Sequence, residues 1–284
     1  MITKEKTENF IKLTPKGAFS VAKTFDCGQC FRFDPVENTP HACEFSGVAF
    51  GRQVSFAEDK GELYIYGATE KEVREIFVPF LGLDLDYDAI DKDIVSRSNN
   101  AALVRAVEFG RGIRILRQDP WEAVCSFIIS QNNNIPRIKK IIAAMSERYG
   151  EPIGGAYAFP TPEAIRDAGV DGMFALKTGF RAKYLVDAAE RVIDGRLELG
   201  KIADMPIDEA AKKLCEVKGI GPKIAACSLL FGFQRYDAFP IDVWIRRVME
   251  KYFEPNFDIA SLGPYAGIAQ QYLFYYERYL GGGE

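Results

Sequence analysis

Apolar residues in the first third of the chain are spaced as in β-strands. Strand-like segments occupy residues 28–33, 44–50, 52–57 and 62–67, and Asp59-Lys60-Gly61 is a turn signal between the last two. Short strands joined by tight turns pair antiparallel. We therefore predict an antiparallel sheet in the N-terminal part of the chain.

From residue 69 onward the apolar positions recur with the period of a helix. Thr69 and Glu72 have the spacing of a capping box before an apolar helical face. Later helices are expected to begin at Asp119-Pro120, Pro136, Thr161-Pro162, Arg181 and Asp242. The predicted fold class is α+β, with an N-terminal antiparallel β-sheet domain followed by a helical body.

Residues 208–233 predict two helices joined by a tight turn. The first helix ends at Lys218-Gly219-Ile220-Gly221, and Pro222 suits the first position of the second helix. The glycines allow a sharp turn, and the free N–H groups at the start of the second helix suit a phosphate. Taken alone, the same pattern is equally typical of an ordinary helical hairpin.

Two charged residues follow this turn, Lys223 and Asp242. Lys223 lies in the first turn of a helix, where the macrodipole destabilises an ammonium group and so favours the neutral amine that acts as a nucleophile. Asp242 precedes an amphipathic helix, so its simplest role is an N-cap. Capping and catalysis are compatible, because one carboxylate oxygen can cap while the other faces a cleft.

Charge is unevenly distributed along the 284 residues. The formal net charge of -4 argues against a uniformly basic surface for nucleic acid. Residues 111–148 nevertheless contain seven Lys and Arg against three Asp and Glu, whereas residues 54–96 contain four against eleven. One face can therefore be basic, although solvated helix faces also explain both stretches.

The chain has the composition of a globular protein. No apolar run approaches the roughly 20 residues of a membrane span, and the first twelve residues have no apolar signal segment. Its six cysteines are scattered, and with 48% hydrophobic residues it does not need a disulfide framework. We expect a cytoplasmic protein with reduced thiols and no membrane association.

The hairpin region carries a family resemblance. Residues 214–243, with Gly-Ile-Gly-Pro-Lys followed by Pro-Ile-Asp-Val, resemble the helix-hairpin-helix and Gly/Pro…Asp motif of the superfamily that includes endonuclease III and 8-oxoguanine DNA glycosylase. Residues 27–32, 116–138, 179–184 and 263–274 resemble segments of the latter, in the same order. The resemblance spans essentially the whole chain.

This resemblance implies an activity and a domain organisation. The chain is expected to be a bifunctional DNA glycosylase and AP lyase that excises 8-oxoguanine from duplex DNA, preferably opposite cytosine, as a monomer. The implied domains are a sheet domain at 1–95, a helical domain of 96–134 and 224–284 lining the active cleft, and a helical domain at 135–223 that ends in the hairpin.

The resemblance also assigns roles at the reacting base. Lys223 matches the lysine that attacks the sugar C1′, and Asp242 the carboxylate that stabilises the cationic sugar. Gly28 matches the glycine whose carbonyl accepts the N7 hydrogen of 8-oxoguanine; guanine would present a lone pair there instead. The remaining base contacts fall to Cys227 and Phe274, which sandwich the base, and Gln270, which reads its pairing edge.

Further matches concern the DNA around the extruded base. Asn132 matches the side chain that fills the vacated space, and Arg137 and Arg181 those that read the orphaned cytosine. Two positions depart from the family: Phe180 replaces a tyrosine wedge and keeps the stacking surface, and Trp244 replaces a histidine that contacts a phosphate. Gly219 and Gly221 of the hairpin complete the expected DNA contacts.

No cofactor is expected to be required. Cys27 and Cys30 have no second pair of cysteines, and the four iron–sulfur cysteines that follow the hairpin in endonuclease III are missing, so neither a zinc site nor a cluster is expected. In the fold's relatives, hairpin carbonyls hold a monovalent cation. The resemblance implies such a site near Cys215, Val217 and Ile220.

Simpler interpretations remain for several of these residues. Cys227 and Phe274 could be core residues, Gly28 a strand bulge, and the three asparagines from Asn132 the end of a helix. Two other functions also remain open. An alkylated-base glycosylase would use a water nucleophile with Asp242 alone, and a DNA-binding module without catalysis would have no use for the pair of Lys223 and Asp242.

Overall fold

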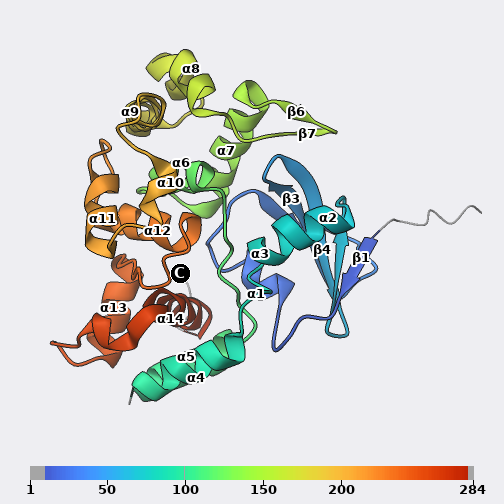
Figure 1. Ribbon diagram of the computed structural model, residues 1–284, viewed down its shortest axis with the longest axis vertical. Helices are drawn as coiled ribbons and strands as arrows, with labels where there is room; N and C mark the ends of the chain where they lie inside the picture. Colours follow the sequence, from blue (N-terminus) through green and yellow to red (C-terminus); the bar gives the residue numbers. More distant parts are fainter. Residues whose placement is uncertain (1–9, 99, 281–284) are drawn as a thin grey trace, which may run out of the picture.

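The computed structural model describes residues 10–98 and 100–280, and the strands of its main sheet lie together on one side of the molecule (Figure 1). An antiparallel sheet of five strands has the order β1-β5-β4-β3-β2. The strands are β1 (Phe10–Leu13), β2 (Phe33–Pro35), β3 (Cys43–Ala49), β4 (Arg52–Asp59) and β5 (Glu62–Tyr66). The three predicted segments that became β3, β4 and β5 are confirmed, as is the antiparallel pairing.

The strand predicted at residues 28–33 is wrong, because β2 begins only at Phe33. Gly28 has a φ of +81°, outside the range of a strand. Gln29 is fully buried, and its side-chain amide donates to the carbonyls of Thr24 and Arg114 at 2.8 Å each. This segment is thus held by side-chain hydrogen bonds and not by a strand ladder. The edge strand β1 was not predicted from the sequence.

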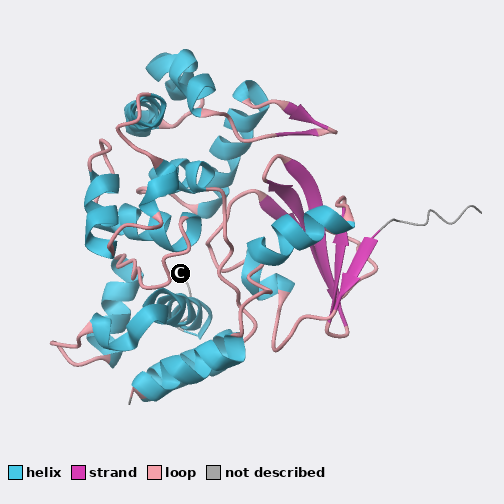
Figure 2. Cartoon of the chain, viewed as in Figure 1, coloured by secondary structure: helices cyan, strands magenta, loops and turns pink. Residues whose placement is uncertain are grey.

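Two sets of helices accompany the sheet (Figure 2). The helices of the sheet side and of the segment after it are α1 (Val21–Phe25), α2 (Glu70–Glu72), the π-helix η1 (Val73–Phe77), α3 (Val78–Phe80), α4 (Tyr87–Arg97) and α5 (Ala101–Gly110). The capping box of Thr69 and Glu72 begins α2 as predicted. After α5 an extended segment runs between the sheet and the helical body to α6 (Figure 1).

The helical body starts with α6 (Pro120–Ser130) and α7 (Ile135–Tyr149). Side chains of Asp119, Asn134 and Thr161 cap α6, α7 and α8, so the predicted starts of these helices are confirmed. The remaining elements are β6 (Pro152–Ile153), β7 (Ala156–Tyr157), α8 (Pro162–Ala175), the 3-10 helix η2 (Gly179–Arg181), α9 (Ala182–Ile193), α10 (Leu199–Ile202), α11 (Ile207–Cys215), α12 (Pro222–Gly232), α13 (Val243–Tyr252), the 3-10 helix η3 (Ile259–Tyr265) and α14 (Ala266–Leu280).

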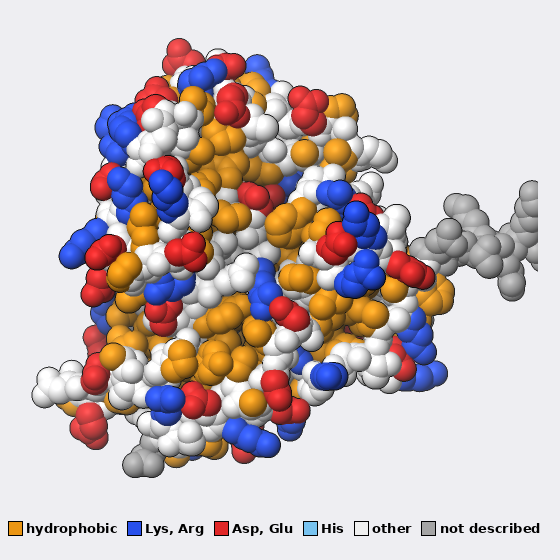
Figure 3. All heavy atoms as spheres, viewed as in Figure 1, with side chains coloured by type: hydrophobic (Ala, Val, Ile, Leu, Met, Phe, Trp, Pro, Cys, Tyr) orange, Lys and Arg blue, Asp and Glu red, His pale blue; other side chains and the backbone are white. Residues whose placement is uncertain are grey.

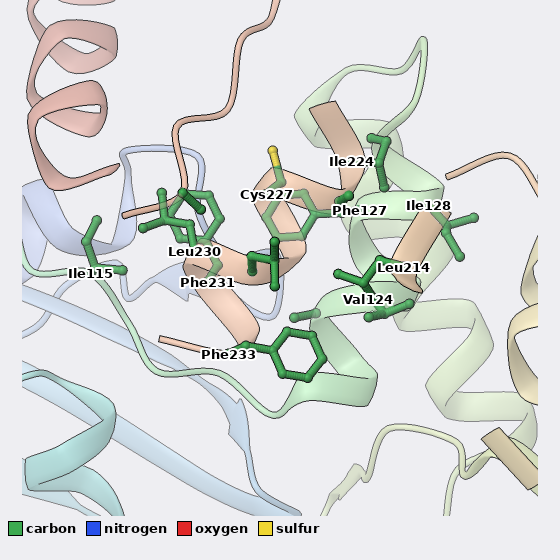
Figure 4. Packing of buried hydrophobic residues seen from close by; sticks show 14 of the residues in the cluster. Ile115, Val124, Phe127, Ile128, Leu214, Ile224, Cys227, Leu230, Phe231 and Phe233 are labelled. Atoms are coloured by element: carbon green, nitrogen blue, oxygen red, sulfur yellow. The ribbon is translucent and has the colours of Figure 1, made fainter. Parts of the chain in front are cut away.

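Two hydrophobic clusters hold the molecule together. One lies between the sheet and α1 to α3, and it includes Leu116 from the extended segment. The other fills the helical body, and part of it is seen in Figure 4. It also includes Cys27 and Phe31, which lie between α1 and β2. Residues around position 28 therefore belong to the wall of the helical body, although in sequence they lie between strands β1 and β2 of the sheet.

Within the described residues, none of the helices is both long and apolar enough to cross a lipid bilayer. The expectation that the chain has no signal segment rests partly on residues 1–9. These residues lie outside the described part of the chain.

Candidate active site

The predicted hairpin is present as α11 and α12. Gly219 has a φ of +81°, and a Cβ atom there would lie 2.3 Å from the ring of Tyr184 on α9, so only glycine fits. Gly221 is the N-cap of α12, with no other atom within 4 Å of the place a Cβ would take. The turn thus approaches α9 closely at one glycine and is open at the other.

The start of α12 leaves backbone donors free. No side chain caps the helix, Pro222 has no N–H, and the first intrahelical bond runs from Ala225 N–H to the Gly221 carbonyl at 3.0 Å. The N–H groups of Lys223 and Ile224 have no acceptor among the described residues. Free amides at a helix N-terminus, where the dipole is positive, form a site for an anion.

A cleft of about 950 Å³ lies at this end of α12. Its lining comes from five separate parts of the chain: the segment at Gly28, the turn between α6 and α7, the hairpin, the start of α13, and α14. Seven of the predicted site residues line it: Gly28, Asn132, Gly221, Lys223, Asp242, Trp244 and Phe274.

A smaller cavity of about 70 Å³ shares a wall with the cleft. Gly28, Lys223, Asp242 and Phe274 line both spaces, so the amine and the carboxylate lie where the two meet. The other predicted base-contacting residues, Cys227 and Gln270, line the smaller cavity. The structure therefore brings together all six residues predicted to surround the reacting base.

Cys227 lies at the edge of the hydrophobic core, one helical turn after Lys223. Figure 4 shows its sulfur pointing away from the other labelled side chains of the cluster. Burial raises the pKa of this thiol to about 11, although the nearby positive charge of Lys223 acts in the opposite direction. The thiol therefore stays protonated and neutral beside the amine, as a surface for packing.

Asp242 combines two features predicted from its position. Its Oδ1 atom accepts the N–H of Ile245 at 2.8 Å and so caps α13, and the residue also lines both spaces. Since the cap occupies one carboxylate oxygen, the other is available to the cleft. The carboxylate is half-buried, and α13 fixes its position.

Gln270 is 5% exposed, and its Oε1 atom has no hydrogen-bond partner in the described structure. A buried acceptor without a partner is costly, by about 1–3 kcal/mol. Because this residue lines the smaller cavity, a ligand with a donor can supply the missing bond. This feature distinguishes Gln270 from a core residue.

The three asparagines between α6 and α7 differ in their contacts. Asn134 caps α7, and Asn133 donates to the Ile129 carbonyl at 3.1 Å, so both have structural roles. Asn132 has a φ of +46°, is exposed, and its side chain has no hydrogen-bond partner among the described residues. Only Asn132 of the three therefore has a side chain free to contact DNA.

Arg181 is buried beneath this turn. Its guanidinium donates to the carbonyls of Gln131, Asn132 and Thr178, with the last two bonds at 3.1 and 3.0 Å. Burial and then the nearby charge of Arg137 lower the pKa of Arg181. Arg181 thus anchors the turn, whereas Arg137 is exposed beside it. Neither arginine lines the cleft.

Comparison with known proteins identifies the family. Residues 12–124 match the model of the 8-oxoguanine DNA glycosylase N-terminal domain, and residues 125–258 that of the HhH-GPD superfamily of base excision DNA repair proteins. A solved 8-oxoguanine glycosylase/lyase from Clostridium acetobutylicum, in complex with dsDNA containing cytosine opposite to 8-oxoG, is 36% identical, with a TM-score of 0.85. The match covers 96% of this chain and 98% of that one. The chain belongs to the 8-oxoguanine DNA glycosylase family.

More distant relatives agree with this assignment. The N-glycosylase/DNA lyase OGG1 of Arabidopsis thaliana is 28% identical over 274 residues, which is 91% of this chain and 73% of that protein. A probable N-glycosylase/DNA lyase of Methanothermobacter thermautotrophicus is 29% identical over 229 residues, 69% of this chain and 72% of that protein. These relatives are named as enzymes, which identifies this 8-oxoguanine glycosylase family member as a DNA glycosylase with lyase activity.

The two departures from the family pattern are exposed apolar side chains. Phe180, which lies outside the cleft, is 47% exposed, with the Arg181 guanidinium 4.4 Å from its ring centroid. Trp244 is 37% exposed at the rim of the cleft, beside Ile241 and Val243, which are exposed too. Exposed rings of this kind offer stacking surfaces.

Charge in the cleft differs from charge elsewhere. Acidic, basic and hydrophobic side chains are interspersed over the face seen in Figure 3. In contrast, the described residues that line the cleft include Lys223, Arg246 and Arg278 but only one carboxylate, that of Asp242. The cleft is therefore positively charged although the whole chain is negative, as binding of a phosphate backbone requires.

The described residues contain no group of three or more His, Cys, Asp or Glu that could hold a metal ion. Of the hairpin carbonyls expected to hold a monovalent cation, that of Val217 accepts the N–H of Ile220 at 3.1 Å. The cation stays a prediction.

Sequence reasoning missed several residues of the smaller cavity, among them Phe127, Phe231 and Gln271. Phe127 lines it and stacks on Phe231, with ring centroids 5.3 Å apart. Gln271 also lines it and donates to the Cys27 carbonyl at 2.9 Å. The periodicity of α6 marks Phe127 only as a buried position, and no local signal separates Gln271 from its neighbour.

Proposed function

We propose that this protein excises 8-oxoguanine from duplex DNA and then cleaves the strand, with Lys223 as the nucleophile. The observation that carries the proposal is the position of Lys223 and Asp242 where a basic cleft opens into a smaller cavity. The duplex lies along the cleft, and the extruded base enters the cavity. Extrusion costs a few kcal/mol, which contacts in the pocket and to phosphates offset.

In the first step the neutral amine of Lys223 attacks C1′ of the deoxyribose. The glycosidic bond breaks, and its electron pair leaves with the base, which takes up a proton. Asp242 stabilises the positive charge that develops on the sugar. Loss of an amine proton and opening of the sugar ring give a Schiff base between Lys223 and C1′.

The second step cleaves the strand. The protonated Schiff base acidifies a C2′ hydrogen, so a base can remove it, and the C3′–O bond breaks with its electron pair leaving on the 3′ phosphate. Water then hydrolyses the imine and restores Lys223. One side chain therefore serves both the glycosylase and the lyase reaction, with no redox or metal chemistry required.

Selection of the oxidised base rests on two polar groups of the cavity wall. The Gly28 carbonyl accepts the N7 hydrogen, which guanine does not have, and Gln270 bonds the pairing edge of the base with its free amide group. Cys227 and Phe274 sandwich the base between them. A neutral thiol suits this role because it adds no charge next to the base.

We propose that Asn132 fills the space left by the base and that Arg137 and Arg181 contact the orphaned cytosine. Arg137 is exposed and has to give up one bond, to the Lys177 carbonyl at 3.3 Å, whereas Arg181 must exchange at least one of its bonds to the turn. The start of α12, with Gly219 and Gly221, binds a phosphate, and Phe180 and Trp244 stack at the edges. Slower excision opposite adenine, and loss of that preference in Arg137→Ala, would test this assignment.

We further infer that the protein acts as a monomer in the cytoplasm and needs no cofactor, with at most a monovalent cation at the hairpin carbonyls. Sedimentation with and without DNA, and activity after treatment with a chelator, test these points.

Borohydride trapping on duplex DNA with 8-oxoguanine opposite cytosine tests the main proposal. The parent is expected to form a covalent adduct, Lys223→Gln none, and Lys212→Gln, on the exposed face of α11, as much as the parent. An adduct that persists in Lys223→Gln would assign the nucleophile elsewhere. Base release by the parent without any adduct would point to a water nucleophile.

A further inference from the structure

Three consecutive backbone carbonyls, those of residues 27 to 29 in the segment at Gly28, differ in their partners. The Cys27 carbonyl accepts the side-chain amide of Gln271 at 2.9 Å, and the Gln29 carbonyl accepts that of Gln118 at 2.7 Å. The carbonyl of Gly28 between them has no donor among the described residues. The two outer carbonyls are thus occupied by glutamines from α14 and from the extended segment, and only the middle one is free.

The same segment is fixed by a third glutamine. The side chain of Gln29 donates to the carbonyls of Thr24 and Arg114 and accepts the N–H of Leu116, each at 2.8 Å. Gln29 is fully buried, so these bonds are shielded from water. The segment at Gly28 is therefore tied to α1, to the extended segment and to α14 at once.

Such restraint matters because the central residue is glycine. Gly28 has a φ of +81° and, with no side chain, rotates more freely than any other residue. Each peptide unit is planar, so a hydrogen bond to a carbonyl fixes the plane of that unit. Holding the units on both sides leaves the Gly28 carbonyl little freedom to turn away from the base.

We propose that Gln271 and Gln118 are positioning residues for the selection of 8-oxoguanine over guanine, acting by holding the Gly28 carbonyl in its accepting orientation. This inference rests on the proposed function. It assigns different roles to two adjacent glutamines. Gln270 has an Oε1 atom without a partner, which can bond the base, whereas the side-chain amide of Gln271 donates to the Cys27 carbonyl.

Gln118 makes the inference testable, because it does not line the smaller cavity and cannot touch the base there. The variants Gln271→Met and Gln118→Met keep side-chain length and remove the amide donor. Gln53→Met, at an exposed position of β4, is the matched control. For each, single-turnover excision of 8-oxoguanine opposite cytosine is compared with strand cleavage at a preformed abasic site, which needs Lys223 but no base recognition.

We expect each positioning variant to slow excision of 8-oxoguanine about tenfold, as loss of one buried hydrogen bond allows. Cleavage at the abasic site should stay within about twofold of the parent, since the chemistry there needs no recognised base. Each substitution is also combined with Lys223→Gln, so that binding can be measured without reaction. In these double variants the preference for DNA with 8-oxoguanine over DNA with guanine, taken as the ratio of the two affinities, should fall as well. Gln53→Met should behave as the parent.

Equal loss of both reactions would overturn the inference, because it would mean general damage to the fold, and so would no loss in either. An effect of Gln271→Met without one of Gln118→Met would assign Gln271 a direct base contact instead. Thermal unfolding shows which variants are folded, and Gln118→Met, whose side chain does not line the cavity, decides between a positioning role and a direct contact. A parent that does not excise 8-oxoguanine would overturn the proposed function itself, which is a different result.

Discussion

The helices α12 and α13 both begin at the cleft, but their first turns are built in opposite ways. Asp242 caps α13 with its own side chain, in a bond of 2.8 Å to Ile245 N–H. Gly221 offers α12 no side chain, and the next charged residue, Lys223, has the sign that the helix dipole disfavours. The start of α13 is locally satisfied, whereas that of α12 is left open for an anion.

The difference teaches how an uncapped helix start is kept in place. Contacts from α9 replace the missing cap: the Asp187 carboxylate accepts the N–H of Lys218 at 2.9 Å, and the ring of Tyr184 packs on Gly219. One helix start is thus fixed by its own sequence, and the other by a neighbouring helix. Four substitutions can test this comparison.

The largest effect is expected from Asp242→Asn. Asparagine caps a helix as well as aspartate does, so the melting temperature should change little. The negative charge that stabilises the cationic sugar is lost, so excision should slow by about 100-fold or more. Asp242→Ala should lose both charge and cap and cost about 1 kcal/mol of stability as well. Normal excision by Asp242→Asn would leave the residue with capping alone.

Gly221→Asp should convert the open start of α12 into a capped one. The backbone there is extended and the space is open, so aspartate can cap the helix and add about 0.5 kcal/mol of stability. The same carboxylate would repel a phosphate, and we expect the Kd for duplex DNA to rise about tenfold. Gly221→Ser, which caps without charge, is the control. Unchanged DNA affinity in Gly221→Asp would mean that no phosphate binds at this helix start.

Gly219→Ala should destabilise the hairpin by about 1–3 kcal/mol, because it combines a positive φ with a clash against Tyr184. Gly61→Ala, in the turn between β4 and β5, has nearly the same φ of +80° but no atom within 4 Å of its Cβ. The difference between the two variants in urea unfolding isolates the contact with α9. Equal losses would show that packing on Tyr184 contributes nothing.

The smallest effect concerns Asp187 and depends on pH. Although burial favours its protonated form, the hydrogen bonds from Lys218 N–H and Arg191 prevail and lower the pKa of Asp187. A lowered pKa in the folded state stabilises the protein at neutral pH, and this contribution is lost as the pH falls below about 4. Asp187→Asn should cost about 1 kcal/mol at pH 7 and less at pH 3.5. A cost that does not depend on pH would exclude the charge as its origin.

Local signals predicted those parts of the site that lie next to one another in sequence. The glycines of the hairpin, the start of α12 at Pro222 and the cap at Asp242 all follow from preferences within a few residues. The same holds for β3 to β5 and for the caps of α6, α7 and α8. The resemblance to known glycosylases added the residues that meet only in three dimensions, such as Gly28 and Phe274.

Contacts between distant segments could not be predicted in this way. The strand expected at residues 28–33 is absent because Gln29 satisfies its hydrogen bonds with the extended segment, 85 to 87 residues later. Nothing near Gln271 indicates that its partner is Cys27, 244 residues earlier. The apolar pattern of α6 does not show that Phe127 faces a cavity. Each of these features depends on tertiary packing.

The bond between Gln271 and Cys27 also has a consequence for synthesis of the protein. Lys223 and Asp242 leave the ribosome before α14 does, whereas the wall formed by Gly28 is closed only when α14 packs against it. A nascent chain that has not yet made α14 therefore already carries the amine, its carboxylate and Gly28, but it lacks Gln270 and the bond from Gln271 to the Cys27 carbonyl. The two reacting groups are therefore made before the wall that discriminates between bases is completed.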